Sequence, residues 1–146
     1  MEKQYKILVA ADFSYNNTPS MVSDFLERRG FCISKANEKT EAMALLEKTA
    51  DSDLPNCIVT NLADMLKIKK NGRLADIIIF YLFNDQDFNP IEDSRVKYYL
   101  ERGFDNILYF NIKNTIIGGL SRLDLLTKIK LMAELNSLRR QVKLLE

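Results

Sequence analysis

The chain has 146 residues and a mass of 16.9 kDa, the size of one domain with a short extension. Its 21 basic and 20 acidic residues nearly cancel, so the charge excess typical of nucleic-acid binding is absent. There is no histidine, which excludes histidine general bases, histidine metal ligands and a phosphohistidine relay. An enzyme would have to work with carboxylates, lysine or tyrosine, and we predict that the chain is not an enzyme.

The two cysteines, Cys32 and Cys57, are too few for a disulfide scaffold, and each lies within a short apolar run. We predict two buried, reduced thiols, with a redox pair as the alternative. The first apolar run is too short for a signal peptide, and no apolar stretch reaches the length of a membrane span. The sequence therefore predicts a cytoplasmic protein without a membrane partner.

The first part of the chain alternates short apolar runs with amphipathic segments. Residues 7–11 form a continuous apolar run that ends before Asp12, as in a strand buried on both faces. Thr18 is a candidate N-cap with proline after it, and it predicts a helix that ends at Gly30. The remaining elements predicted here are a strand over 31–36, a helix over 41–50 and a strand over 56–62.

The second part continues the same alternation. Residues 63–74 have no clear period, so a short helix or an irregular loop is expected there. Its basic run (Lys67, Lys69, Lys70) is interpreted as a solvated loop, with an anion site as the alternative. The apolar run over 77–83 predicts a strand, and residues 113–146 predict one long helix, or two that meet at Gly118–Gly119. Between them, a helix is predicted over 91–102 and a strand over 106–110.

Five strand–helix repeats predict a doubly wound α/β domain with a five-stranded parallel sheet and an extended carboxyl-terminal helix. Ligands bind such sheets at the carboxyl ends of the strands. The side chains at those ends are therefore the candidates for function.

Five segments in chain order resemble the receiver domain of two-component response regulators, over about residues 5–130. They are the opening Lys6–Val9, Gly30 before a strand, Leu54–Val59, the glycine-led stretch Gly103–Leu108, and the apolar helix face with Leu123, Leu126 and Ile129. The resemblance implies a flavodoxin-like sheet of strand order 2-1-3-4-5.

Most of the positions that carry receiver chemistry hold other residues in this chain. Receivers bind magnesium through two consecutive acids after the first strand, where this chain has Ala11 and Asp12. The phosphoacceptor aspartate corresponds to Asn61, whose amide lacks the nucleophilic carboxylate oxygen. The switch hydroxyl, the rotating aromatic residue and the phosphate-pairing lysine correspond to Tyr81, Ile107 and Phe110.

The resemblance therefore implies a pseudo-receiver, which keeps the scaffold without the phosphotransfer residues. One carboxylate is a poor magnesium site, so no metal and no cofactor is predicted. We interpret Asp12 as a cap, with a residual cation ligand as the alternative, and Asn61 as a hydrogen-bonded side chain that fixes a turn. Tyr81 and Phe110 are interpreted as packing that fills the vacated site, with stacking on a flat ligand as the alternative. The interval from Asn61 to Tyr81 is shorter than receivers have, so a reduced third helix is expected.

Apolar residues near the carboxyl terminus recur at spacings of four and three, as in a coiled coil. We call this set the leucine seam: Leu131, Leu135, Leu138, Val142 and Leu145. With Leu135 and Val142 at a and the others at d, the seam is compatible with a parallel homodimer. Glu134 at g and Arg139 at the following e are then placed for an interchain ion pair. The alternative is a stripe that folds back onto its own domain.

These patterns divide the chain into a pseudo-receiver domain (1–127) and a coiled-coil helix (128–146). We expect this helix to lead to an output domain beyond the sequence. The favoured function is a non-phosphorylatable signalling module that dimerises through this helix and regulates or docks an output domain or partner protein. The alternative is a sensor that binds a small ligand in the degenerate pocket. A flavodoxin-like enzyme is disfavoured because no glycine-rich phosphate loop follows the first strand.

Overall fold

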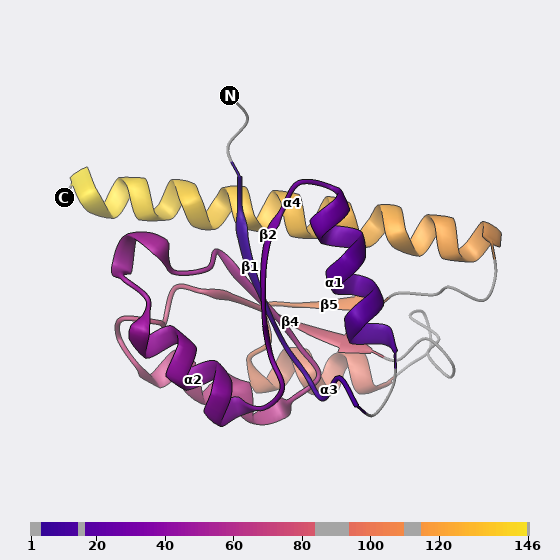
Figure 1. The fold of residues 1–146 in the computed structure, drawn as a ribbon, viewed down its shortest axis with the longest axis horizontal. Helices are drawn as coiled ribbons and strands as arrows, with labels where there is room; N and C mark the ends of the chain where they lie inside the picture. The colour runs from indigo at the N-terminus through magenta and orange to yellow at the C-terminus, as the bar shows by residue number, and fades with distance from the viewer. Residues whose placement is uncertain (1–3, 15–16, 84–93, 110–114, 146) are drawn as a thin grey trace.

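In the computed structural model, five parallel strands form one sheet between two layers of helices (Figure 1). The structure describes residues 4–14, 17–83, 94–109 and 115–145, with backbone only for residues 109 and 115–121. The strand order is β2-β1-β3-β4-β5, and every neighbouring pair is parallel. The predicted fold class, strand order and extended last helix are confirmed.

The helices and strands follow the predicted alternation, with small shifts at their ends. The strands are β1 (Lys6–Ala10), β2 (Cys32–Ala36), β3 (Cys57–Thr60), β4 (Ile78–Phe83) and β5 (Asn106–Tyr109). The α-helices are α1 (Thr18–Arg28), α2 (Lys39–Lys48), α3 (Ser94–Arg102) and α4 (Thr115–Leu145). Two 3-10 segments, η1 (Asp51–Asp53) and η2 (Ala63–Lys70), lie in the connections.

Two local predictions about helix positions are corrected. α1 has Asn17 as its N-cap, so Thr18 is the first helical residue rather than the cap. The second helix begins and ends two residues earlier than predicted. Gly30 and Gly103, which follow α1 and α3, have φ angles of 94° and 118°, a region that L side chains rarely adopt.

Successive side chains of a strand point to opposite faces of the sheet, and helices cover both faces, so both sets of side chains are buried. On one side, Val9 and Val59 pack with α1 and α4. On the other side, Leu8 and Ile58 pack with α2 and η2. In Figure 1 the sheet is seen nearly edge-on, with α1 and α4 above it and α2 and α3 below it.

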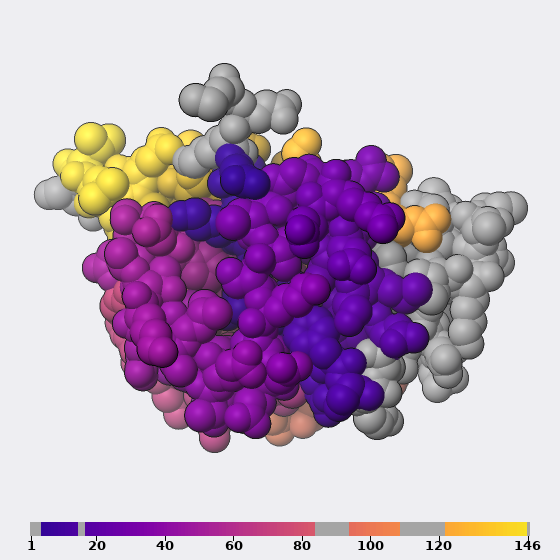
Figure 2. Space-filling view, in the orientation of Figure 1, coloured from indigo at the N-terminus to yellow at the C-terminus, as the bar shows by residue number. Residues whose placement is uncertain are grey.

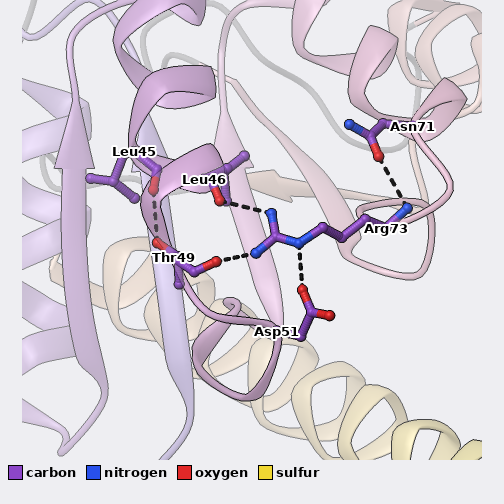
Figure 3. Close-up of polar contacts among 6 residues, drawn as sticks. All are labelled: Leu45, Leu46, Thr49, Asp51, Asn71 and Arg73. Atoms are coloured by element: carbon purple, nitrogen blue, oxygen red, sulfur yellow. Dashed lines mark hydrogen bonds and ion pairs between the residues drawn. The ribbon is translucent and has the colours of Figure 1, made fainter.

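A reduced third helix was predicted between β3 and β4, and the structure has the 3-10 segment η2 there. Arg73 holds the turn that follows η2. The Arg73 guanidinium donates to the backbone oxygens of Leu46 and Thr49 at the end of α2, and pairs with the Asp51 carboxylate (Figure 3). The Arg73 amide donates to the Asn71 side chain at 3.0 Å. A cation at a helix C-terminus also complements the helix dipole.

Two predictions of burial are wrong. Cys32 is exposed, because it lies on β2 at the edge of the sheet, whereas Cys57 on the central strand β3 is buried. Both thiols are free, and burial raises the pKa of the Cys57 thiol far above its ordinary value. On α3, the helical spacing of Val96, Tyr99 and Leu100 predicts that all three face inward; Val96 and Tyr99 are half-buried, but Leu100 is exposed.

α4 is one continuous helix without a break at the glycine pair, and its inner face packs on the sheet. That face holds Leu125, Ile129, Ala133 and Asn136, all fully buried. Leu125, rather than the predicted Leu123, fills the start of this face, and Leu123 is exposed. In the part of the chain that the structure describes, no helix is long and apolar enough to cross a membrane.

A polar network, which we call the α4 clasp, fastens the helix to the amino-terminal edge of the sheet. It comprises Asn56, Asp76, Asn136 and Arg140. The Asn136 side chain accepts from Asn56 Nδ2 at 3.1 Å and donates to the Asp76 backbone oxygen at 2.8 Å. Arg140 pairs with the Asp76 carboxylate at 3.1 Å and donates to the backbone oxygens of Leu54 and Pro55. The inner face of α4 is therefore held to the domain as far as residue 140.

Candidate functional site

A pocket of about 360 Å³ opens where β1, β3 and β4 end. We call it the carboxyl-edge pocket. The described residues that line it are Asp12, Thr18, Pro19, Asn61, Leu62, Tyr81, Leu82, Phe83, Arg95 and Tyr99. The structure brings Asp12, Asn61 and Tyr81 of the predicted set together here, because the strands are parallel and Ala10, Thr60 and Tyr81 lie in register.

Two of the other predicted residues, Ala11 and Ile107, are not on this wall. Ala11 is fully buried, and its amide donates to the Ala36 backbone oxygen at 3.0 Å. Ile107 is buried in a small cluster with Phe83, against which Tyr81, Val96 and Tyr99 pack. Phe110 lies outside the described residues.

Asp12 is the one acid among the described residues of the pocket wall. Its Oδ1 accepts hydrogen bonds from the Ser14 amide at 3.0 Å and from the Ser14 hydroxyl at 2.6 Å. This geometry is an Asx turn, in which the carboxylate holds its own loop. Across the described residues, no cluster of three or more cysteines and acids is placed to hold a metal ion.

Asn61 differs from its sequence interpretation. Its Oδ1 is buried and has no hydrogen-bond partner. The turn after β3 is held instead by Thr60, whose Oγ1 accepts from the Leu62 amide at 2.9 Å. The sequence interpretation, in which the Asn61 side chain is hydrogen-bonded and fixes the turn, is therefore wrong as far as Oδ1 is concerned. The hydroxyl of Thr60 fills that role, and Asn61, which lines the pocket, keeps a buried side-chain oxygen without a partner.

Aromatic side chains form the part of the pocket wall between β4 and α3. The Tyr81 and Tyr99 rings stack with centroids 3.8 Å apart and planes 15° apart. Phe83 and Phe104 meet Tyr81 edge to face at 5.0 and 5.1 Å. Burial, and next the neighbouring Tyr99, raise the pKa of Tyr81 far above its ordinary value. Tyr81 therefore stays protonated near neutral pH and cannot serve as a base.

Arg95 brings a positive charge to the same wall. Its guanidinium lies over the Phe83 ring, 5.4 Å from the centroid. Arg95, Thr18 and Tyr99 were not predicted from the sequence as pocket residues. No local motif marks them as such, since they reach the pocket only through the packing of α1 and α3 beside the strand ends.

The second candidate surface is the outer face of α4. The leucine seam residues are exposed, at 61% for Leu131, 36% for Leu135, 52% for Leu138, 56% for Val142 and 89% for Leu145. Glu134 and Arg139 beside them are also exposed. The alternative in which this stripe folds back onto its own domain is therefore wrong. Another stripe of the same helix, which includes Ile129 and Ala133, covers the sheet instead.

The two stripes lie on opposite sides of α4. At 100° per residue, the buried positions 129, 133, 136 and 140 fall on one side of the helix, and the seam falls about half a turn away. In heptad terms, positions b and f face the sheet, while a and d face outward. In Figure 2 the carboxyl-terminal part of α4 forms the upper left rim of the molecule.

No protein-family model matches the sequence, and no curated protein sequence matches it. Several solved structures do match the chain. NtrX from Brucella abortus in complex with ATP matches with a TM-score of 0.72 and 18% identity, over 99% of this chain and 30% of that chain. A response regulator from Desulfuromonas acetoxidans matches with a TM-score of 0.62 and 19% identity, over 90% of this chain and 98% of that chain.

The chemotaxis response regulator CheY4 of Vibrio cholerae gives a TM-score of 0.59 and 18% identity, over 87% of this chain and 99% of that chain. The chain thus spans about 30% of the length of NtrX but nearly the whole length of single receivers. The likeness establishes that the chain has the fold of response regulator receiver domains.

Proposed function

We propose that the chain is a signalling module of receiver fold that takes up no phosphoryl group and catalyses no reaction. It forms a homodimer through the leucine seam of α4 and regulates or docks an output domain or partner protein. The observation that carries the proposal is the double character of α4. Its inner face is held on the sheet by apolar packing and by the α4 clasp, while its outer face leaves five large apolar side chains in solvent.

The chemistry at the strand ends supports the absence of phosphorylation. Aspartyl phosphate forms when a carboxylate oxygen attacks phosphorus, and the amide of Asn61 has no such nucleophile. Asp12 offers a single carboxylate, which already accepts two hydrogen bonds from Ser14. A magnesium ion favours several charged oxygen ligands, and the described wall supplies only one acid.

Geometry and charge support a second copy of the chain as the partner of the seam. A parallel pair brings the a and d residues of both copies together, with leucine at every d position. Glu134 then lies beside Arg139 of the other copy, and symmetry repeats this opposite-charge pair on both sides. Exposed ion pairs contribute only about 0.2–1 kcal/mol each, so the pair fixes orientation while the apolar side chains supply the affinity.

The absence of phosphorylation is tested by incubation with Mg²⁺ and acetyl phosphate, followed by intact-mass spectrometry. A receiver domain that retains its acids serves as the positive control in the same buffer. We expect the mass of this chain to stay unchanged while the control gains a phosphoryl group. A stoichiometric phosphoryl adduct on this chain would overturn the first half of the proposal.

The dimer is tested by sedimentation equilibrium at micromolar concentration. Leu138→Ser removes a d residue of the seam, and Leu144→Ser makes the same change at an exposed position off the seam, where the leucine is 86% exposed. We expect a dimer for the unmodified chain and for Leu144→Ser, and a monomer for Leu138→Ser. A monomeric unmodified chain, or equal effects of both substitutions, would contradict the proposal.

A further inference from the structure

We propose that the carboxyl-edge pocket binds a small planar molecule with N–H donors on its rim, such as an amide- or amino-substituted aromatic ring. The proposal adds an input to the signalling module proposed above. It concerns the opposite edge of the sheet from the α4 clasp, so binding does not require that the chain dimerises.

The unsatisfied oxygen of Asn61 is the first support. Buried acceptors in folded proteins are almost always hydrogen-bonded, because an unpaired one loses its water without replacement. Asn61 Oδ1 has no partner, although the neighbouring Thr60 hydroxyl and Leu62 amide are paired with each other. An apolar side chain of similar shape would avoid the free-energy cost of burying an unpaired acceptor. A donor that arrives from the pocket would satisfy the oxygen once the Asn61 amide turns toward it, and this would explain an amide at this position.

The hydrogen-bonding character of the wall at Asn61 favours a ligand that carries an N–H donor. Asn61 Oδ1 is an acceptor, and the Asp12 carboxylate places a negative charge on the same wall. A phosphate or carboxylate ligand would be attracted by the Arg95 guanidinium on the same wall, but it would present acceptors to the Asp12 carboxylate and to Asn61 Oδ1 and would leave that oxygen unsatisfied. An amide or amino group presents N–H instead, and its nitrogen can be neutral or cationic.

The aromatic wall selects a flat ligand. Tyr81, Phe83 and Tyr99 all line the pocket, and their rings pack against one another. Ligand pockets are commonly apolar and aromatic with a few placed polar groups, and volumes of about 300–1,000 Å³ are typical. The pocket of about 360 Å³ is at the small end, which suits a single substituted ring or a fused bicycle.

The binding experiment uses two matched pairs of probes and NMR titration of the full chain with ¹⁵N labelling. Nicotinamide is compared with N,N-dimethylnicotinamide, and 9-methyladenine with its 6-dimethylamino counterpart, so each pair differs only in the N–H donors. We expect at least one donor probe to shift the Asn61 side-chain amide resonances at millimolar concentration or below. Its methylated partner should bind at least tenfold more weakly. No binding by either donor probe, or equal binding within both pairs, would overturn the proposal.

A substitution at Asn61 separates a ligand role from a structural one. Asn61→Leu removes the acceptor, and Asn56→Leu makes the same change at a buried amide that is fully engaged with Lys6 and Asn136. We expect Asn61→Leu to abolish probe binding while its melting temperature stays equal to or above that of the unmodified chain. Asn56→Leu should lower the melting temperature. Equal lowering by both substitutions would show that Asn61 is satisfied within the free protein, by an ordered water for example, and would overturn the proposal.

Binding of the probes at the carboxyl-edge pocket should not depend on the dimer. Titration of the monomeric Leu138→Ser variant should give the same shifts as the unmodified chain, because the seam and the pocket share no residue. If Leu138→Ser turns out not to affect assembly, the proposed dimer fails while the pocket result stands. If the probes fail and the dimer dissociates as expected, only the pocket proposal is lost.

Discussion

Replacing Asn136 by alanine should weaken the attachment of α4 more than any single change on its outer face. Asn136 is fully buried, and its side chain joins two parts of the domain that are far apart in sequence. It accepts from Asn56 Nδ2 and donates to the Asp76 backbone oxygen. Asn136→Ala removes both hydrogen bonds and leaves one buried donor and one carbonyl oxygen without a partner.

The expected magnitude follows from those two groups. An unsatisfied buried donor or acceptor costs about 1–3 kcal/mol. Two such groups cost about 2–6 kcal/mol, and we expect the lower half of that range because the Asp76 oxygen is only partly buried. Alanine is a better helix former than asparagine by up to about 0.7 kcal/mol, which offsets part of the loss. The free energy of unfolding should therefore fall by about 1.5–3 kcal/mol.

Urea denaturation measures this change, with all variants at one protein concentration because the stability of a dimer depends on concentration. Gln141→Ala, at an exposed position five residues further along α4, is the matched control and should change the free energy of unfolding by less than about 0.5 kcal/mol. A change below about 0.5 kcal/mol for Asn136→Ala would refute the claim that the clasp holds α4 to the sheet.

Three further predictions follow from the other polar and titratable groups. Arg73→Lys keeps the charge but loses the planar guanidinium that binds two carbonyl oxygens and the Asp51 carboxylate. The free energy of unfolding measured in urea should therefore fall by about 1–2 kcal/mol. An unchanged urea midpoint would contradict this prediction. Burial raises the pKa of Cys57 above its ordinary 9.0 and that of Tyr81 above its ordinary 10.0, so both groups bind protons more tightly in the folded state. Their contribution to the free energy of unfolding is complete below about pH 9 and is lost as the pH rises further. Cys57→Ala should move the onset of this loss to higher pH. A free energy of unfolding that stays constant from pH 8 to 11 would contradict the prediction. Asn61→Asp restores a carboxylate, yet acetyl phosphate should still add no phosphoryl group because Ala11 leaves the magnesium site with a single acid; an adduct by intact-mass spectrometry would show that one substitution suffices.

The strands and their order were accessible from sequence because they depend on local pattern and on general rules of α/β folding. Unbroken apolar runs such as 77–83 signal strands buried on both faces, and Gly30 marks the end of α1 through its positive φ. Strand ends in parallel register then bring Asp12, Asn61 and Tyr81 to one edge. These inferences required no knowledge of which side chains touch.

Features that depend on tertiary neighbours were not accessible in the same way. Cys32 sits in an apolar run, yet its strand is at the sheet edge and its side chain is exposed. Asn61 was expected to fix a turn, but Thr60 one residue earlier takes that role. The α4 clasp joins Asn136 to Asn56 across 80 residues, and polar residues on a helix usually indicate a solvated face. Only the packed structure shows that this polar stripe faces inward and the leucines face outward.

Cysteine cross-linking tests the proposed parallel dimer most directly. In a Cys32→Ser background, which removes the exposed native thiol, Leu138→Cys places one thiol at a d position and Leu144→Cys places one at an exposed position off the seam. A symmetric parallel seam brings the same residue of two copies together, so mild oxidation should convert Leu138→Cys to a disulfide-linked dimer in high yield and leave Leu144→Cys monomeric on non-reducing gels. Equal cross-linking at both positions, or none at Leu138→Cys, would contradict the parallel pairing of α4.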